Sequence, residues 1–280
     1  MPFLFLICCT GPAIAGPLLR KGWDNMKIAG IYFSGTGNTK YCVETFLRAF
    51  RESGPCCPLE SPDAVQTISD HDVIVFGYPV YYSSLPTIVR DFIYQNAGVF
   101  HGKKVFLIAT MGLFSGDGTG CAAKPLKKLG SDILGGLHVR MPDCIGDEKV
   151  LKKPLDQNRR IVREAAEKLR EAAGRCRSGK PPQKGLGFLS YVAGLFGQRL
   201  WFFGKTKTYS DKVKIHADRC IGCGVCVKVC PMENLDLVGG KAATKNRCTL
   251  CYRCFSVCPK QAVTILGKTV YEQCRLEKYT

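Results

Sequence analysis

Eight cysteines in the last quarter of the chain have the spacing of metal-cluster ligands. They form two copies of the pattern Cys-x2-Cys-x2-Cys-x3-Cys-Pro, displaced by 28 residues. Three cysteines at this spacing can turn their thiolates towards one 4Fe–4S cube, whereas the proline turn carries the fourth away to the other cluster. The repeat therefore predicts two clusters that exchange their fourth ligand. The predicted ligand sets are Cys220, Cys223, Cys226 with Cys258, and Cys248, Cys251, Cys254 with Cys230.

Zinc is the alternative metal for such a block. Tetrahedral zinc sites favour paired Cys-x2-Cys ligands, whereas each run here holds four cysteines and is followed by proline. Gly222 and Gly224 can bring backbone amides close to the inorganic sulfides, where they would tune the potential. We therefore expect iron–sulfur clusters. The remaining cysteines show no such pattern and are interpreted mostly as small buried apolar residues: Cys8, Cys9, Cys42, Cys56, Cys57, Cys121, Cys144, Cys176 and Cys274.

A second candidate site is a polar loop that follows a short apolar run and precedes a helical pattern. Its hydroxyl and amide groups can surround a terminal phosphate, and the helix dipole adds favourable charge. The loop contains no lysine and matches neither the nucleoside-triphosphate nor the dinucleotide glycine pattern. It therefore predicts a site for the phosphate of FMN, with an ordinary polar turn as the alternative. The residues are Ser34, Gly35, Thr36, Gly37, Asn38 and Thr39.

Alternating strand and helix patterns place these loops. Apolar runs predict strands at 27–33, 73–77, 104–110 and 137–141, with a weaker edge strand at 56–59. Helical spacing follows at 41–52, from 86 to about 95, up to residue 129, and at 156–175. This alternation predicts an α/β fold with a parallel sheet. About five strands fit the doubly wound type of sheet, in which the strand order is 2-1-3-4-5. Ligands bind beyond the carboxyl ends of such strands, where the polar turns lie.

The phosphate loop, the two cysteine runs and their order resemble the flavodoxin–ferredoxin fusion family of anaerobic bacteria and archaea. In that family a flavodoxin-like domain precedes a small C-terminal α+β ferredoxin domain of the clostridial two-cluster type. The resemblance covers residues 26–265 and implies two further loops that hold the isoalloxazine ring. Tyr81, Tyr82 and Phe114 are the candidate stacking residues. By this resemblance the ring-binding residues are Pro79, Val80, Tyr81, Tyr82, Ser83, Thr110, Met111, Gly112, Leu113, Phe114 and Ser115.

The predicted ring loops differ from those of true flavodoxins in one respect. Asp117 is the only acidic residue near them, fewer than in true flavodoxins, so the very low flavin potential of that family does not transfer directly.

The resemblance and the local composition divide the chain into five parts. The predicted parts are an extension or mis-assigned start at 1–25, the FMN domain at 26–178, a linker with an aromatic docking segment at 179–210, the two-cluster domain at 211–268, and a tail at 269–280.

Composition restricts the class of protein. The chain has 280 residues, 46% of them hydrophobic, and 17 cysteines, which favours metal ligation in a reducing, cytoplasmic compartment. No run of 18 apolar residues exists, so no spanning helix is expected, and the aromatic segment at 188–203 is interpreted as docking the domains or contacting a membrane surface. The net charge of +17 predicts an acidic redox partner of the ferredoxin or flavodoxin type.

Three functions remain open on this evidence. The first is electron transfer between FMN and the two clusters. The second is an oxidoreductase that reduces a small molecule at the flavin, although His71, His101 and His138 are scattered and suggest no proton donor. The third is a redox sensor, for which no DNA-binding motif is found, and no nucleic-acid partner is expected. Electron transfer is the preferred prediction.

Overall fold

A parallel sheet forms the first half of the protein. The computed structural model describes residues 26–51, 54–113, 116–187, 190 and 212–280. Within them, five parallel strands follow the order β2-β1-β3-β4-β5, which confirms the predicted fold and strand order. The strands are β1 (Ile28–Tyr32), β2 (Cys56–Pro58), β3 (Val73–Pro79), β4 (Lys104–Met111) and β5 (Asp132–Arg140).

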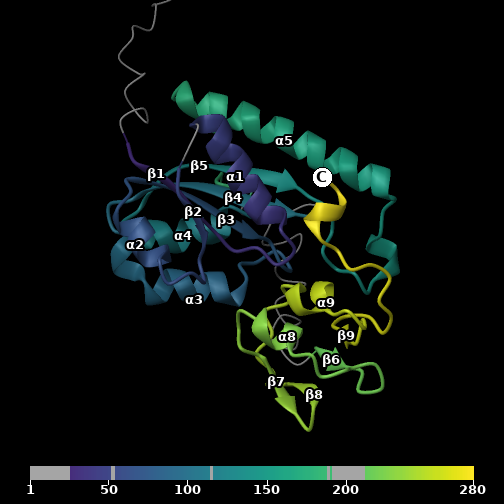
Figure 1. Cartoon of the computed structure of the whole chain (residues 1–280). Helices are drawn as coiled ribbons and strands as arrows, with labels where there is room; N and C mark the ends of the chain where they lie inside the picture. Colours follow the sequence, from purple (N-terminus) through teal and green to yellow (C-terminus); the bar gives the residue numbers. More distant parts are fainter. Residues whose placement is uncertain (1–25, 52–53, 114–115, 188–189, 191–211) are drawn as a thin grey trace, which may run out of the picture.

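Helices cover both faces of this sheet (Figure 1). On one face, α1 packs against the long α5, whose buried stripe includes Ile161, Ala165 and Leu169. On the other face, α2, α3 and α4 enclose a second apolar cluster with Phe76 and Phe100. The helices are α1 (Asn38–Phe50), α2 (Ala64–Ser69), α3 (Thr87–Gln95), α4 (Gly120–Lys128) and α5 (Leu155–Arg177), with the short turns η2 (Ala97–Phe100) and η3 (Lys149–Leu151).

Two local predictions differ from the structure, and one helix was not predicted. The turn expected at residues 78–79 is the end of β3, because Tyr78 and Pro79 still pair with β4. Strand β5 begins five residues earlier than expected, because Gly135 and Gly136 interrupt the apolar pattern without interrupting the pairing. Helix α2 was not expected at all, since it is only six residues long.

The start of the expected linker packs along the outer edge of β5. The amide of Gly136 donates to the carbonyl of Pro182 at 2.8 Å, and the amide of Lys184 donates to the carbonyl of Gly136 at 2.9 Å. An added Cβ at Gly136 would lie 2.9 Å from the carbonyl oxygen of Lys184, so glycine permits this approach. Residues 182–184 therefore protect the edge of the sheet instead of forming a free connection.

The described part of the cysteine-rich half, residues 212–280, contains two small antiparallel sheets and the short helices α8 and α9 (Figure 1). Each helix begins at the same place in its cysteine run, directly after a residue with a left-handed backbone. The repeat in sequence is thus a repeat in conformation. Its elements are β6 (Lys214–Ile215), α8 (Val225–Lys228), β7 (Leu235–Val238), β8 (Lys241–Thr244), α9 (Arg253–Val257) and β9 (Val263–Thr264).

The final segment, residues 269–280, returns from the cysteine-rich half to the first half. Its short turn η5 (Leu276–Lys278) lies near α1 and α5 (Figure 1). Leu276 and Tyr279 are buried in the same apolar cluster as α1 and α5. The amide of Leu276 also donates to the carbonyl of Thr36 at 3.0 Å. The tail predicted at 269–280 therefore ties the two halves together at the polar loop after β1.

Two predicted segments lie outside the described residues: the extension at 1–25 and nearly all of the aromatic segment at 188–203. Among the helices that the structure does describe, none has the length and apolar character needed to cross a bilayer.

Candidate functional site

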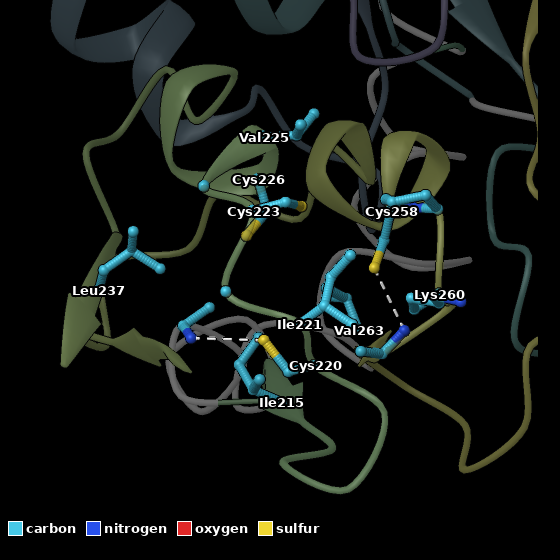
Figure 2. Close-up of a pocket in the computed structure, with 15 residues that line it drawn as sticks. Ile215, Cys220, Ile221, Cys223, Val225, Cys226, Leu237, Cys258, Lys260 and Val263 are labelled. Atoms are coloured by element: carbon cyan, nitrogen blue, oxygen red, sulfur yellow. Dashed lines mark hydrogen bonds between the residues drawn. The ribbon is translucent and has the colours of Figure 1, made fainter. Parts of the chain in front are cut away.

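The first predicted ligand set lines one pocket in the cysteine-rich half (Figure 2). Cys220, Cys223, Cys226 and Cys258 all face this pocket, although Cys258 comes from the second run. An added Cβ at Gly222 would overlap the carbonyl of Gly240, so glycine is required where the loop closes. The structure therefore brings together the four thiols that the exchanged-ligand prediction groups.

Backbone amides point at two of these sulfurs. The amide of Ala262 lies 3.2 Å from Cys258 Sγ, and the amide of Ala242 lies 3.5 Å from Cys220 Sγ. Amide donation stabilises a thiolate, and it lowers the pKa of the Cys220 thiol below its ordinary value. This environment suits cysteines that bind metal as thiolates.

The second predicted ligand set lines another pocket, with Cys230, Cys248, Cys251 and Cys254 on its walls. The amide of Asn234 donates to Cys230 Sγ at 3.3 Å, at the repeat position equivalent to Ala262. Burial raises the pKa of the Cys248 thiol to about 12 and that of Cys251 to about 11. Cluster binding here would therefore release protons.

Every cysteine that the structure describes is a free thiol. Within those same residues, no group of three or more His, Cys, Asp or Glu side chains is arranged to hold a single metal ion. The four cysteine ligands of a 4Fe–4S cluster bind four different iron atoms and lie further apart than the ligands of one ion. This finding therefore concerns only sites for a single metal ion. Of the cysteines predicted to be buried and apolar, Cys42, Cys176 and Cys274 are buried, whereas Cys56, Cys57, Cys121 and Cys144 are partly buried; Cys8 and Cys9 lie outside the description.

A third cavity, of about 270 Å³, lies at the carboxyl ends of β1, β3 and β4. It collects most of the residues predicted to bind FMN, but none of His71, His101 and His138. Gly37 is the exception among the described loop residues, since it packs against Leu276. Phe114 and Ser115 lie outside the described residues. The predicted residues on its walls are Ser34, Gly35, Thr36, Asn38, Thr39, Pro79, Val80, Tyr81, Tyr82, Ser83, Thr110, Met111, Gly112 and Leu113.

The polar loop after β1 has an unsatisfied hydroxyl group that fits a phosphate. Ser34 Oγ is buried and finds no hydrogen-bond partner among the described residues. A buried hydroxyl without a partner is costly, and a phosphate oxygen would accept its hydrogen bond. The loop is held by Thr39 Oγ1, 2.8 Å from Thr110 Oγ1, and by the Asn38 side-chain amide, which donates to the Pro142 carbonyl at 2.8 Å. The residues present therefore fit the phosphate of FMN.

The loop after β3 has a strained backbone beside the cavity. Tyr82 and Ser83 both adopt the left-handed region, with φ of 48° and 56°. This conformation is energetically unfavourable for residues other than glycine, and such strained residues are concentrated at binding sites. Tyr81 and Tyr82 both line the cavity. They are the two candidate stacking residues that the structure describes.

The loop after β5 lines the cavity, although it was not predicted as part of the site. Met141, Pro142, Asp143, Cys144 and Ile145 all line the cavity. The sequence carried a usable signal, because this loop also follows a parallel strand and ends at the same edge of the sheet. The isolated apolar and acidic residues in it match no motif.

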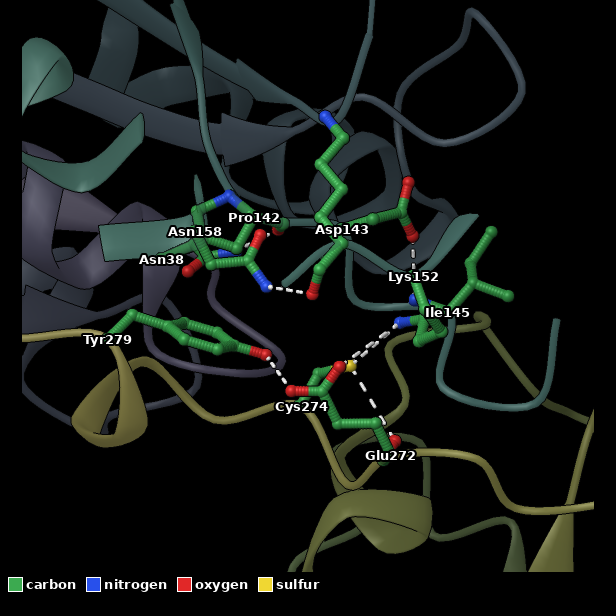
Figure 3. A network of polar contacts seen from close by, with 10 residues as sticks. Asn38, Pro142, Asp143, Ile145, Lys152, Asn158, Glu272, Cys274 and Tyr279 are labelled. Carbon is green, nitrogen blue, oxygen red and sulfur yellow. Dashed lines mark hydrogen bonds and ion pairs between the residues drawn. The ribbon is translucent and has the colours of Figure 1, made fainter. Parts of the chain in front are cut away.

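Asp143 brings a carboxyl group to the cavity (Figure 3). Its Oδ1 accepts the amide of Ile145 at 2.8 Å, and an added Cβ at Gly112 would overlap Oδ2. Burial raises the pKa of this carboxyl, against the lowering effect of the Ile145 amide, Lys152 and Lys153. The prediction that Asp117 is the only nearby acid is therefore incomplete.

The cysteine-rich half closes the cavity from the other side. Leu250 and Tyr252, the neighbours of Cys251, line the cavity together with the phosphate loop. An added Cβ at Gly35 would overlap the carbonyl oxygen of Cys251, so the two backbones are in direct contact. No motif predicted these two residues, because they lie far from the phosphate loop in sequence. The structure thus places the second cysteine run, and no residue of the first, on the cavity wall.

Arg253 links the halves beside the phosphate loop. Its Nη2 donates to the Ser34 carbonyl at 2.8 Å and to Glu60 Oε1 at 2.6 Å, and its guanidinium lies 5.7 Å from the centre of the Phe33 ring. Burial lowers the pKa of Arg253, but the contact with Glu60 outweighs this effect and the net shift is upward. The ion pair is therefore retained within the interface.

Asp147 forms a second link. It is 1% exposed, and it accepts hydrogen bonds from the Tyr252 hydroxyl at 2.8 Å and from the amides of Ile265 and Leu266 at 2.6 and 3.0 Å. Burial and this carboxylate both raise the pKa of Tyr252, so the hydroxyl stays protonated and donates. The loop after β5 is thereby fixed to the second cysteine run.

A polar network that joins the tail to the segment after β5 completes the interface (Figure 3). The tail contributes Glu272, which accepts the Tyr279 hydroxyl at 2.5 Å and forms an ion pair with Lys152 at 3.9 Å. Lys152 Nζ also lies 3.1 Å from Cys274 Sγ. The tail therefore adds polar contacts to the apolar ones made by Leu276.

Comparison with known proteins identifies both halves. Residues 31–143 match the model of a flavodoxin domain, and residues 212–259 match the model of a 4Fe–4S dicluster domain. The fold and the two matched domains define a flavodoxin-type protein extended by an iron–sulfur domain. The chain therefore carries a flavodoxin domain followed by a 4Fe–4S dicluster domain, which is the domain order that the sequence resemblance predicted.

Individual relatives match parts of the chain. Ferredoxin-2 from Desulfomicrobium norvegicum is 57% identical over 30 residues, which cover 11% of this chain and 51% of that protein, about half its length. A ferredoxin from Pyrococcus woesei is 75% identical over 20 residues, covering 7% of this chain and 95% of the relative. Among solved structures, reduced flavodoxin from Megasphaera elsdenii is 26% identical, with a TM-score of 0.38, and the match covers 50% of this chain and 98% of that one.

Proposed function

We propose that this protein moves electrons between FMN, bound in the cavity beside the phosphate loop, and two 4Fe–4S clusters, bound by the two four-cysteine pockets. The observation that carries the proposal is the shared wall. The neighbours of Cys251 line the same cavity as the phosphate loop. A flavin there would lie beside a cluster-binding motif, which is the arrangement that electron transfer between them requires.

The proposal assigns the flavin to residues 26–178, the clusters to residues 211–268, and the fixing of one half against the other to the tail at 269–280. The bound groups supply the redox chemistry, since each cluster exchanges single electrons and FMN holds one or two. The chain's own residues bind and position. Ser34 and its loop would donate to the phosphate, Tyr81 and Tyr82 would contact the ring, and Asp143 could hold a proton at the cavity wall.

Purification under argon tests the proposal. We expect about eight iron atoms and about one FMN per chain from two clusters and one flavin site. Rapid mixing with a one-electron reductant should then show iron–sulfur and flavin absorbance changing in a linked sequence. Protein that holds neither iron nor flavin, or cofactors that are reduced independently, would overturn the proposal.

The partner is proposed to be another redox protein with an acidic surface. The net charge of +17 supports an electrostatic approach by such a partner. The free thiols of the described cysteines support a reducing compartment, which we take to be the cytoplasm. The rate of electron exchange with an acidic ferredoxin should fall steeply as salt rises. A rate unaffected by salt would argue against an acidic partner.

A second candidate function is reduction of a small molecule at the flavin. Asp143 favours it, because a carboxyl with a raised pKa in the cavity can donate a proton. Asp143→Asn should then abolish substrate reduction while leaving the flavin bound. Screening of simple oxidants such as quinones and nitro compounds with reduced protein would find such an activity, and a complete lack of turnover would leave electron transfer alone.

A further inference from the structure

The two cysteine runs share an unusual backbone on both sides of their second cysteine, Cys223 or Cys251. In the first run, Gly222 and Gly224 have φ of 69° and 72°. At the equivalent positions of the second run, Leu250 and Tyr252 have φ of 61° and 59°. Glycine adopts this left-handed region freely, whereas a residue with a Cβ pays for it in conformational free energy. The second run therefore keeps two strained residues where its own repeat shows that glycine fits.

The surroundings show what the two side chains contact. Leu250 and Tyr252 line the cavity beside the phosphate loop, whereas Gly222 and Gly224 line the pocket of the first cysteine set. Leu250 is 8% exposed and Tyr252 is 2% exposed. Both side chains are therefore held between the cysteine run and the cavity, and neither is a surface residue that happens to lie nearby.

The chemistry of this wall suits a flat aromatic ligand. The Tyr252 hydroxyl is occupied by Asp147, and its ring packs edge-on against Phe255 with centroids 5.3 Å apart. The ring position is thus fixed from two sides. Together with Leu250 it adds carbon surface to the cavity that Tyr81 and Tyr82 also line. Apolar walls with a few polar groups are typical of sites for planar cofactors.

We propose that Leu250 and Tyr252 are FMN-contacting residues supplied by the iron–sulfur half, so that the flavin site is complete only when the two halves are packed together. The inference rests on the proposed function, because it takes FMN as the ligand of the cavity. It goes further by dividing the flavin site between the domains. It also explains why glycine is absent from these two positions of the second run.

The repeat itself provides the test. Leu250→Gly installs the residue that the first run carries at the same position, and glycine suits the local φ of 61°. Gln261→Gly is the matched control, since Gln261 also has a left-handed backbone, with φ of 49°, but it is exposed and does not line the cavity. FMN affinity is measured on the full chain with its clusters, under argon, by quenching of flavin fluorescence, and iron content checks that each variant is assembled.

We expect Leu250→Gly to weaken FMN binding by at least about tenfold, as for loss of a buried apolar contact, and Gln261→Gly to leave it within about twofold. Tyr252→Leu, which removes the ring but keeps an apolar side chain, should also weaken binding. If Leu250→Gly loses iron, Leu250→Asn replaces it, because asparagine tolerates the left-handed region. A fully iron-loaded variant at position 250 that binds FMN like the wild type would overturn the inference. Wild-type protein with clusters but no affinity for FMN would overturn the proposed flavin function instead.

Discussion

The two cysteine runs have the same spacing and the same backbone, yet they face different surroundings. The first run lies at the surface, where Cys223 and Ile221 are exposed. The second is buried against the flavodoxin half, where Cys251 belongs to an apolar cluster of the sheet. The difference lies in the residues between the cysteines. Glycines and Val225 in the first run are replaced in the second by Leu250, Tyr252 and Arg253. Leu250 lines the cavity shared with the other half, and Tyr252 and Arg253 form hydrogen bonds with that half. A repeated motif can therefore keep its cysteine spacing and backbone and change its neighbours.

Removal of one cysteine from each run should give the largest contrast. Cys223→Ala should lose the exposed cluster and keep FMN, because nothing from the first run lines the flavin cavity. Cys251→Ala should lose the buried cluster and also weaken FMN binding by about a hundredfold, since the cavity wall loses its anchor. Iron content, electron paramagnetic resonance and flavin titration measure both. Equal effects on FMN would remove the distinction between the runs.

Asp147 tests whether the second run needs the flavodoxin half. Asp147→Ala leaves two buried donors and one partly buried donor without their acceptor, and we expect the free energy of unfolding to fall by about 3 to 5 kcal/mol. Asp236→Ala is the control, because it removes an exposed ion pair with Lys245 and should cost less than about 1 kcal/mol. Denaturant unfolding followed by cluster absorbance measures both. A small loss for Asp147→Ala would show that the halves are held by other contacts.

One partly buried histidine should make the flavodoxin half sensitive to acid independently of the clusters. Burial, with Lys168 nearby, lowers the pKa of His138 to about 4, and its Nε2 accepts the amide of Thr119 at 3.2 Å. An unfolded histidine titrates near 6.5, so the unfolded state takes up more protons between these values. The folded state, which keeps His138 neutral, therefore has its full free energy of unfolding above about pH 6.5. This free energy falls as the pH is lowered towards 4, by up to about 3 kcal/mol.

His138→Gln should flatten this dependence, and circular dichroism melts of the sheet from pH 7 to pH 4 would measure it. His101→Gln is the control, since His101 is exposed. If the His138 variant keeps the acid dependence of the wild type, the sensitivity arises elsewhere.

Replacement of Arg253 should cause the smallest loss of stability among the changes that distinguish the two runs. Arg253→Val installs the residue of the first run, Val225, and removes the contacts with Ser34 and Glu60. Glu60 is then left without its cation, and we expect a loss of about 2 kcal/mol, reduced by partial exposure of the pair. Glu60→Gln in the Arg253→Val background should recover part of it. No recovery would mean that the cost comes from the lost Ser34 contact.

Sequence patterns predicted the repeated and periodic parts of the molecule well. Alternating apolar runs predicted the strands, and the flavodoxin-like fold predicted their order. The two-cluster motif grouped Cys258 with the first run, whose pocket it lines. The cavity walls at Asp143 and Leu250 were missed because no local pattern marks them. Asp143 is an isolated acid after a strand, and Leu250 is an apolar residue inside a cysteine motif. Only packing between distant segments gives either residue a place at the site.

The contact of Gly35 with Cys251 has a consequence for the timing of electron movement. Backbone atoms meet on both sides, so no flexible side chain separates the phosphate loop from the second run. Side chains change rotamer within nanoseconds, whereas packed backbone segments shift more slowly and by less. Tunnelling rates depend steeply on distance. If main-chain atoms fix the distance between the phosphate loop and the second run, electron-transfer rates should vary little from one molecule to the next. These rates should also depend only weakly on temperature.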